Sequence, residues 1–254
     1  MDPDVRSATP GKCPRCGMTL RLGIPEPVEY PMQLKTVPAV PRAGAPLELF
    51  FKISDPKSGA KVTKFEIVHE KLFHLFVVSQ DLQYFIHEHP VMLPDATFRY
   101  ETKLPKPGLY RLLGDFYPSA GTPQLIAKTI IVPGGEIQTP HLQPDLEPKH
   151  TENMDVELVL DPPQPIAGMK TLMFFHVKPV EGLEQYIGAW AHMLAASDDL
   201  IDLIHTHPFL ADGGPQIQFN MIFPRARTYR VWVQFQRKGV VNTAVFTVPV
   251  SELK

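Results

Sequence analysis

Cysteine is nearly absent from this chain of 254 residues, which has only two, Cys13 and Cys16. Two cysteines three positions apart exclude a disulfide framework that would staple the domains together. No uninterrupted apolar run approaches about 18 residues, so the sequence predicts no transmembrane segment. The net charge of −2 excludes nucleic-acid binding driven by electrostatic attraction as a leading function. As written, the sequence also has no signal peptide.

Proline and apolar residues are plentiful. The 28 prolines, 16 glycines and an apolar content of 44% favour many short strands and turns around real cores rather than long helices. Short strands at regular spacing with turn signals between them are typical of immunoglobulin-like sandwiches, although the Cys…Trp…Cys pattern of antibody domains is absent. The sequence therefore predicts an all-β chain of two tandem immunoglobulin-like β-sandwich domains with a short N-terminal metal-binding peptide.

An internal repeat organises the chain. The stretch FHLFVVSQDLQYFIHEHP, residues 73–90, is echoed by AHMLAASDDLIDLIHTHP, residues 191–208, at an offset of 118 positions. A repeat at domain length indicates two copies of one fold. Each copy keeps three histidines in register while most other residues differ. The histidines are His74, His87 and His89 in the first copy, and His192, His205 and His207 in the second.

The repeat and the proline-rich stretches divide the chain into five segments. They are a heavy-metal-binding peptide (1–25), an extended proline-rich tether (26–46), a first sandwich (47–132), a linker (133–150) and a second sandwich (151–254). Strands before the histidine hairpins are expected at Val62–Val68 in the first copy and, running into the hairpin itself, at Tyr186–Ser197 in the second.

The histidines are expected to meet on one face of a hairpin. Phe73–Ser79 and Gln83–His89 read as two strands with Gln80-Asp81 at the turn. That symmetry places His74 opposite His87, with Cβ atoms roughly 5 Å apart, and His89 diagonally at roughly 7 Å. A turn at Asp198-Asp199 predicts the same triangle for the second copy.

Three imidazoles on one patch suit a borderline transition metal, copper first and zinc second. The alternative interpretation is that these are half-buried histidines bonded to backbone groups near the edge of a sandwich. Their repetition in register favours metal binding.

The two cysteines form a second candidate site. In Cys13-Pro-Arg-Cys16-Gly17 a tight turn aims backbone N–H groups at thiolate sulfurs, and Gly17 supplies the positive φ. Met18 offers a thioether as a third soft ligand, and this set favours Cu⁺ or Zn²⁺ over hard cations. The alternative is an exposed remnant that holds no metal.

The segment PGKCPRCGMTL, Pro10–Leu20, resembles the short heavy-metal-binding domain attached to copper and silver efflux adaptor proteins and some metal-pumping ATPases. The resemblance implies Cys13, Cys16 and, less directly, Met18 as ligands, and a metal-efflux protein as a partner. The family usually opens with an aromatic-Cys-Pro-Met-His-Pro run, whereas here its Cys is missing and Asp2 stands in place of the His. We therefore expect the peptide to be truncated and the true start, upstream of Met1, to carry an export signal.

The hairpin pattern also resembles a repeat of exported bacterial proteins, in which a metal-binding peptide often lies nearby. This second resemblance covers most of residues 45–254 and implies no established activity. Together the two resemblances imply a periplasmic or extracellular location.

No catalytic residues are predicted. Asp115 has Gln234 as its counterpart, so an acid–base role common to both copies is not expected, and no Gly-x-Ser-x-Gly motif occurs. His69 has Ile187 as its counterpart and lies outside the shared triangle.

The leading hypothesis is an extracytoplasmic heavy-metal-binding protein that buffers, delivers or senses copper. One alternative is a tandem immunoglobulin-like interaction or structural module with structural histidines. A second alternative is a copper enzyme that uses three histidines and an open coordination position. Expected partners are a metal ion and a metal-efflux or other protein, without nucleic acid.

Overall fold

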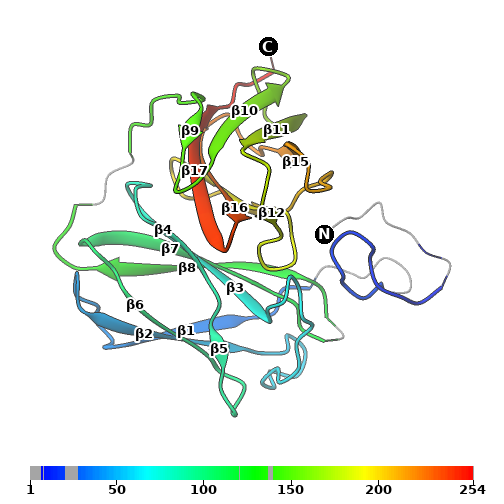
Figure 1. Ribbon diagram of the computed structural model, residues 1–254. Coiled ribbons are helices and arrows are strands. Elements are labelled where there is room, and N and C mark those ends of the chain that lie inside the picture. Colours follow the sequence, from blue (N-terminus) through cyan, green and yellow to red (C-terminus); the bar gives the residue numbers. More distant parts are fainter. Residues whose placement is uncertain (1–6, 8, 21–27, 120, 137–139, 254) are drawn as a thin grey trace. The chain divides into compact units, whose positions relative to one another are not determined.

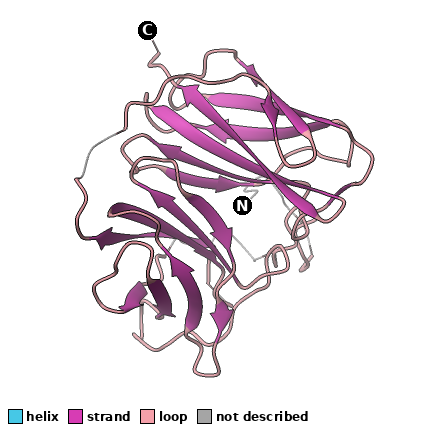
Figure 2. Ribbon diagram, turned by 60° about the vertical axis from the view of Figure 1, so that its left-hand side comes forward, coloured by secondary structure: helices cyan, strands magenta, loops and turns pink. Residues whose placement is uncertain are grey.

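The computed structural model describes residues 7, 9–20, 28–119, 121–136 and 140–253. The chain divides into two compact units, residues 1–138 and 139–254. The described residues form strands, turns and loops without a helix, so the all-β prediction is confirmed (Figure 2). Nowhere in these residues is there a helix with the length and apolarity needed to cross a membrane.

The first unit is a sandwich of two antiparallel four-stranded sheets, with orders β1-β2-β6-β5 and β4-β3-β7-β8 (Figure 1). If the strands are lettered in chain order, these are the A-B-E-D and C′-C-F-G sheets of an immunoglobulin-like fold. The strands are β1 (Met32–Val37), β2 (Pro46–Ile53), β3 (Phe73–Ser79), β4 (Phe85–Glu88), β5 (Val91–Met92), β6 (Phe98–Lys103), β7 (Gly108–Phe116) and β8 (Gln124–Val132).

The second unit repeats this plan with sheets β15-β11-β10-β9 and β12-β16-β13-β14, and β17 pairs with β16. The strands are β9 (Lys149–His150), β10 (Asp155–Asp161), β11 (Lys170–Lys178), β12 (Leu183–Glu184), β13 (His192–Ser197), β14 (Leu203–Thr206), β15 (Gln216–Ile222), β16 (Thr228–Arg237) and β17 (Val240–Pro249).

A tyrosine corner marks the same place in both units. The Tyr110 hydroxyl donates to the Lys106 carbonyl at 2.8 Å, and the Tyr229 hydroxyl lies 3.1 Å from the Arg225 carbonyl. A tyrosine at the start of strand F that bonds back to the backbone a few residues upstream is typical of immunoglobulin-like sandwiches. Strand order and corner together confirm two tandem domains of this type.

Each core lies between the inner faces of its two sheets. In β3 the side chains of Phe73, Leu75 and Val77 belong to the core of the first unit, which also contains Phe51, Phe98 and Tyr110. In β13 the core residues are Met193 and Ala195. Because side chains alternate along a strand, His74 and His192 point to the outer face of their sheets.

Four segments differ from the sequence prediction. Residues 32–37 of the predicted tether form β1, whose alternating side chains let Met32 enter the core and whose backbone pairs with β2. Val62–Val68 is not a continuous strand and makes only isolated bridges, at Phe65 and Val68. The strand expected over Tyr186–Ser197 begins at His192, because a tight turn interrupts it. Lys149–His150, from the predicted linker, forms β9.

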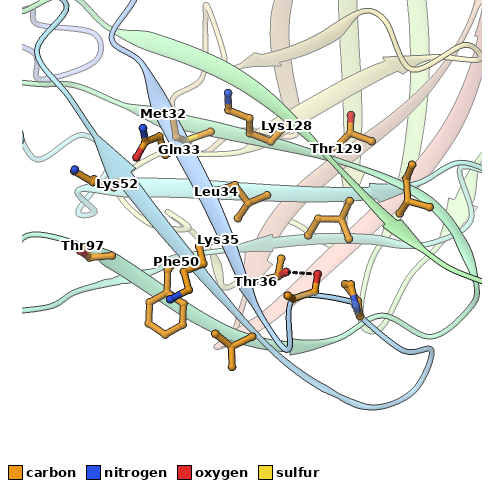
Figure 3. A pocket seen from close by; sticks show the side chains of 15 residues that line it. Met32, Gln33, Leu34, Lys35, Thr36, Phe50, Lys52, Thr97, Lys128 and Thr129 are labelled. Atoms are coloured by element: carbon orange, nitrogen blue, oxygen red, sulfur yellow. Dashed lines mark hydrogen bonds between the residues drawn. The ribbon is translucent and has the colours of Figure 1, made fainter. Parts of the chain in front are cut away.

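A groove of about 980 Å³ opens beside β1 and β8, two edge strands of the first unit (Figure 3). Lys35, Lys52 and Lys128 are among its 15 lining residues, which include no histidine, cysteine or acidic residue. Its donor set therefore does not suit a metal ion.

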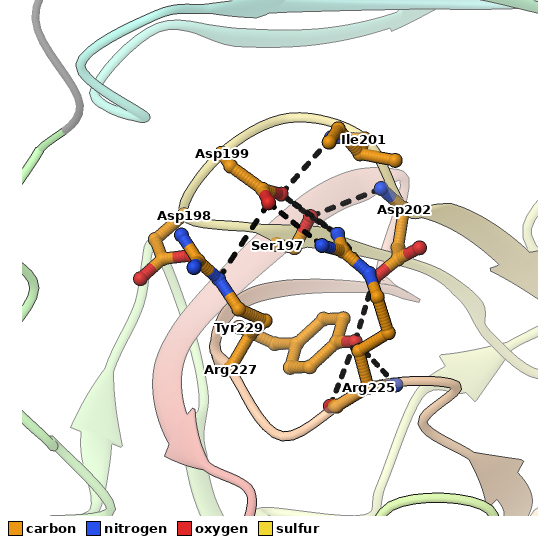
Figure 4. A network of polar contacts seen from close by, with 8 residues as sticks. All are labelled: Ser197, Asp198, Asp199, Ile201, Asp202, Arg225, Arg227 and Tyr229. Atoms are coloured by element: carbon orange, nitrogen blue, oxygen red, sulfur yellow. Dashed lines mark hydrogen bonds and ion pairs between the residues drawn. The ribbon is translucent and has the colours of Figure 1, made fainter.

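A polar network holds the hairpin turn of the second unit (Figure 4). The Arg225 guanidinium binds both carboxylate oxygens of Asp199 at 2.8 Å and donates to Asp202 at 2.9 Å. Ser197 Oγ donates to Asp199 at 2.6 Å, and the Ile201 N–H donates to the same carboxylate at 3.2 Å. The Arg225 guanidinium holds the pKa of Asp199 well below its ordinary value. In the first unit Lys106 replaces this arginine and contacts Asp81 at 3.2 Å.

We predict that Arg225→Ala lowers the free energy of unfolding of the second unit by about 1 kcal/mol, because it breaks a half-buried bidentate ion pair. Both tryptophans, Trp190 and Trp232, lie in this unit, so denaturation followed by tryptophan fluorescence reports on it alone. The control Lys106→Ala, in the first unit, should leave that transition unchanged.

We also predict how the difference in unfolding free energy between wild type and Arg225→Ala depends on pH. Because the pKa of Asp199 is lower in the folded protein than in the unfolded chain, its ionisation stabilises the fold at pH values above its unfolded-state pKa of about 3.8. This stabilisation is lost as the pH falls through the folded-state pKa. The difference between wild type and Arg225→Ala should stay constant down to about pH 4 and narrow below it. A difference that widens in acid would contradict this assignment.

Candidate metal centre

The structure brings each set of three histidines together on the outer face of the C′-C-F-G sheet. In the first set, the candidate ligand atoms of His74, His87 and His89 all lie within 4.8 Å of one another. The same is true of His192, His205 and His207. We call these groups the first and second histidine clusters.

The predicted hairpin register was wrong by two residues in both copies. Phe76, not His74, pairs with His87, and Leu194, not His192, pairs with His205. The loops are four residues long instead of two, because the carboxylates of Asp81 and Asp199 accept backbone and serine hydrogen bonds inside them. A shift of two keeps every side chain on its face, so the histidines still converge.

In the first cluster, the other two histidines both approach one nitrogen of His74. His74 Nδ1 lies 3.1 Å from His87 Nε2 and 3.2 Å from His89 Nε2. The His87 ring stacks on Phe76, with ring centroids 4.3 Å apart. His74 and His87 are 2% and 5% exposed, so both rings are packed in defined positions.

The second cluster has a similar arrangement, with one such short nitrogen contact. His192 Nδ1 lies 3.1 Å from His207 Nε2, and the rings of His192 and His205 are parallel, with centroids 5.9 Å apart. The Tyr186 ring packs edge-on against His192 at 5.4 Å. His192 and His205 are buried, at 1% and 8% exposure.

A backbone carbonyl fixes the tautomer of the central histidine in each cluster. His74 Nε2 lies 3.0 Å from the Val68 carbonyl, and His192 Nε2 lies 2.9 Å from the Tyr186 carbonyl. A carbonyl only accepts, so Nε2 carries the hydrogen and Nδ1 of the neutral ring presents a lone pair to its cluster. Histidines that bind metals usually donate their other N–H in this way.

These carbonyls are held in place by a two-residue turn. Val68 and Lys71 exchange two backbone hydrogen bonds, as do Tyr186 and Ala189. Both central residues of each turn have positive φ: His69 at 47° and Glu70 at 62° in the first, Ile187 at 49° and Gly188 at 69° in the second. Non-glycine residues adopt this conformation at a cost of about 1–2 kcal/mol. Strained backbone kept in both copies is typical of a functional site.

Few features of the sequence point to this supporting turn. The Val68 and Tyr186 carbonyls are backbone groups, which leave no mark in residue type. Gly188 alone hints at the second turn, and the first contains no glycine. His69, which the sequence placed outside the triangle, lies in the first turn, with its ring centroid 6.4 Å from that of His74.

The spacing of the nitrogens fits a single metal ion. Zinc–nitrogen bonds of about 2.0–2.1 Å in a tetrahedral site separate two ligand nitrogens by about 3.3 Å. The separations of 3.1 and 3.2 Å between the central Nδ1 and the Nε2 atoms of His87, His89 and His207 are close to that value. Three neutral imidazoles leave a fourth position open. Copper and zinc are the usual ions for such a set.

One carboxylate that neighbours the first cluster in the chain faces away from it. Glu88 lies between His87 and His89 in the chain but pairs with Leu75, so it points to the opposite face of the sheet. Burial raises the pKa of Glu88 above its ordinary value. The corresponding residue beside the second cluster is Thr206, which is neutral.

Residues 13–18, which we call the cysteine knuckle, form a tight turn. The Gly17 N–H donates to the Cys13 carbonyl at 2.9 Å, and the Cys13 N–H donates to the Met18 carbonyl at 2.6 Å. Gly17 has φ of 72°, as the sequence predicted. Cys13 and Met18 are buried and Cys16 is partly exposed. The residues of the expected upstream half, 1–6, lie outside the described part of the chain.

Fold and site together define a class of protein: a tandem immunoglobulin-like chain with a histidine cluster on each domain and a cysteine knuckle before them. Residues 28–134 and 149–252 match the family model described as a domain of unknown function, DUF8832, and the chain belongs to this family. Residues 1–21 match the model of the heavy metal binding domain. That match supports metal binding as a general property of the chain. No curated protein matches the sequence.

Solved structures with some similarity include FdeC, an Escherichia coli adhesin, at 14% identity, covering 92% of this chain and 68% of that one, with a TM-score of 0.30. The FN1–FN3 domains of chicken CNTN1 have 10% identity, coverage of 91% and 69%, and a TM-score of 0.25. A two-domain fibronectin type III segment of chicken tenascin has 9% identity, coverage of 87% and 99%, and a TM-score of 0.27. Scores this low add nothing to the fold assignment, which is based on strand order and the tyrosine corners.

The turn that supports His192 gives a direct test. Gly188→Val places a β-branched residue at positive φ, so the turn should rearrange and move the Tyr186 carbonyl. Loss of a hydrogen-bond partner to a metal ligand typically costs 10–100-fold in affinity. We therefore expect zinc titration of protein lacking residues 1–25, and hence the two cysteines, to show one of two sites weakened by about tenfold.

Gly239→Val is the matched control. Lys238 and Gly239 form another turn with two positive φ values, 50° and 74°, in the same unit, and no atom lies within 4 Å of a Cβ added at Gly239. This variant carries similar strain and should leave both zinc sites intact. Equal effects of the two variants on zinc binding would show that the Tyr186 carbonyl has no special role.

Proposed function

We propose that this protein is an extracytoplasmic heavy-metal-binding protein, copper first, that buffers the ion and hands it on. The observation that carries the proposal is the central histidine of each cluster. Its Nε2–H is engaged by a backbone carbonyl, and its Nδ1 lone pair faces the cluster. That nitrogen lies 3.1 Å from His87 Nε2 and 3.2 Å from His89 Nε2 in the first cluster, and 3.1 Å from His207 Nε2 in the second. Holding the lone pair in this position costs backbone strain in both domains. Metal binding explains that cost better than a role of the histidines in packing alone.

The two kinds of site differ in ligand chemistry and in rigidity. The histidine clusters are built on paired strands, which hold ligands in fixed positions and suit storage. The knuckle offers Cys13, Cys16 and Met18, soft ligands that favour Cu⁺. A soft-ligand peptide that precedes two rigid sites suits transfer of an ion between a partner and the clusters.

The proposed location outside the cytoplasm follows from the resemblance of the N-terminal peptide to efflux adaptor domains. In that setting the partner that donates or receives the ion would be a metal-efflux protein. Neither is needed for the metal chemistry of the clusters.

Metal content tests the proposal. Protein purified without an affinity tag, then loaded with copper and desalted, should hold about two ions in its high-affinity sites after removal of residues 1–25, as measured by inductively coupled plasma mass spectrometry. His87→Ala combined with His205→Ala should abolish this high-affinity part, because each cluster loses one of three ligands.

His141→Ala combined with His150→Ala is the matched control, because these histidines belong to neither cluster. This pair should bind as much copper as the wild type. Metal that disappears with residues 1–25 would place all binding on the knuckle and contradict the proposal. No metal in either form would make the histidines structural and favour a tandem interaction module.

A further inference from the structure

The two histidine clusters share their ligands but differ in the strand that lies beside the central histidine. In the first unit the β3–β7 register pairs His74 with Asp115. In the second unit the β13–β16 register pairs His192 with Gln234. Directly paired residues of antiparallel strands point to the same face, with Cβ atoms about 4.5–5.5 Å apart. A carboxylate therefore accompanies the first cluster, and a neutral amide accompanies the second.

The supporting turns add no net difference in charge, because the first contains both Glu70 and Lys71 where the second has Gly188 and Ala189. Gln234 is 8% exposed and donates to Thr243 Oγ1 at 3.2 Å, so its amide is part of a neutral, packed surrounding. Asp115 thus supplies a carboxylate on the face of the first cluster, where the second cluster has the neutral Gln234.

Charge near a buried site changes which ion it prefers. The attraction between a carboxylate and an ion scales with the charge of the ion, so a nearby Asp favours a divalent over a monovalent cation. In a neutral, buried site a monovalent ion costs less to desolvate than a divalent ion, because it carries less charge. Imidazole nitrogen serves as a ligand for both zinc and copper, so the ligands themselves do not decide between these ions.

We propose that the two clusters have different ion preferences: the first selects a divalent ion such as Zn²⁺ or Cu²⁺, and the second selects Cu⁺. Asp115 and Gln234 act as the residues that set this selectivity without binding the metal themselves. The inference rests on the proposed function and extends it, because a chain with two unlike sites holds copper in both oxidation states.

The test compares one cluster at a time in the full chain. Cys13→Ser and Cys16→Ser remove the knuckle as a competing Cu⁺ site. On this background His205→Ala with His207→Ala leaves the first cluster, and His87→Ala with His89→Ala leaves the second. Affinities for Zn²⁺ and, under anaerobic reducing conditions, for Cu⁺ are measured by competition with chromophoric chelators, and circular dichroism checks folding.

The ratio of Zn²⁺ to Cu⁺ affinity should be at least about tenfold higher for the first cluster than for the second. Asp115→Asn should lower the Zn²⁺ affinity of the first cluster by about tenfold and its Cu⁺ affinity by only about threefold, since the effect scales with ionic charge. Gln234→Glu, which is nearly isosteric, should raise the Zn²⁺ affinity of the second cluster.

Equal affinity ratios for the two clusters would overturn the inference. So would a loss of both ions by the same factor in Asp115→Asn, because that is the signature of general structural damage and not of a charge effect. Clusters that bind neither Zn²⁺ nor Cu⁺ would overturn the proposed function itself, and with it this inference.

Discussion

One hydrogen bond determines what each histidine cluster can do: the one that the central histidine donates from Nε2 to a backbone carbonyl. It fixes the tautomer of His74 and His192, so that Nδ1 faces the other two rings as a lone pair. The position of that carbonyl depends on a tight turn in which both central residues have positive φ. Each cluster therefore depends on backbone conformation a few residues before its first histidine in the chain.

The rest of the fold places the central histidine and its carbonyl partner on the outer face of a sheet. Alternation along β3 sends Phe73, Leu75 and Val77 into the core and leaves His74 on the other side. The hairpin to β4 then supplies His87 and His89, two positions apart and hence on one face. Both copies keep the three histidines and the supporting turn, while the residues around them differ. The clearest difference is Asp115 in the first copy against Gln234 in the second.

The sequence predicted the fold class and the grouping of the histidines, because period-2 patterns and a repeat at fixed offset determine faces. It predicted the wrong register, because the side chains of Asp81 and Asp199 enlarge the hairpin loops, an effect that strand patterns do not reveal. It also missed the Val68 and Tyr186 carbonyls, since any residue supplies a carbonyl. The strand β1 was mistaken for a tether, because three prolines surround it and obscure its alternation.

The central claim, that the clusters bind metal through three imidazoles, is tested most directly by X-ray absorption spectroscopy of zinc-loaded protein lacking residues 1–25. The account predicts a first shell of nitrogen and oxygen at about 2.0–2.1 Å, with the outer-shell scattering of about three imidazole rings per ion. A shell with one imidazole or none, filled by carboxylate or water oxygen, would contradict it and show that the convergence of the histidines serves packing alone.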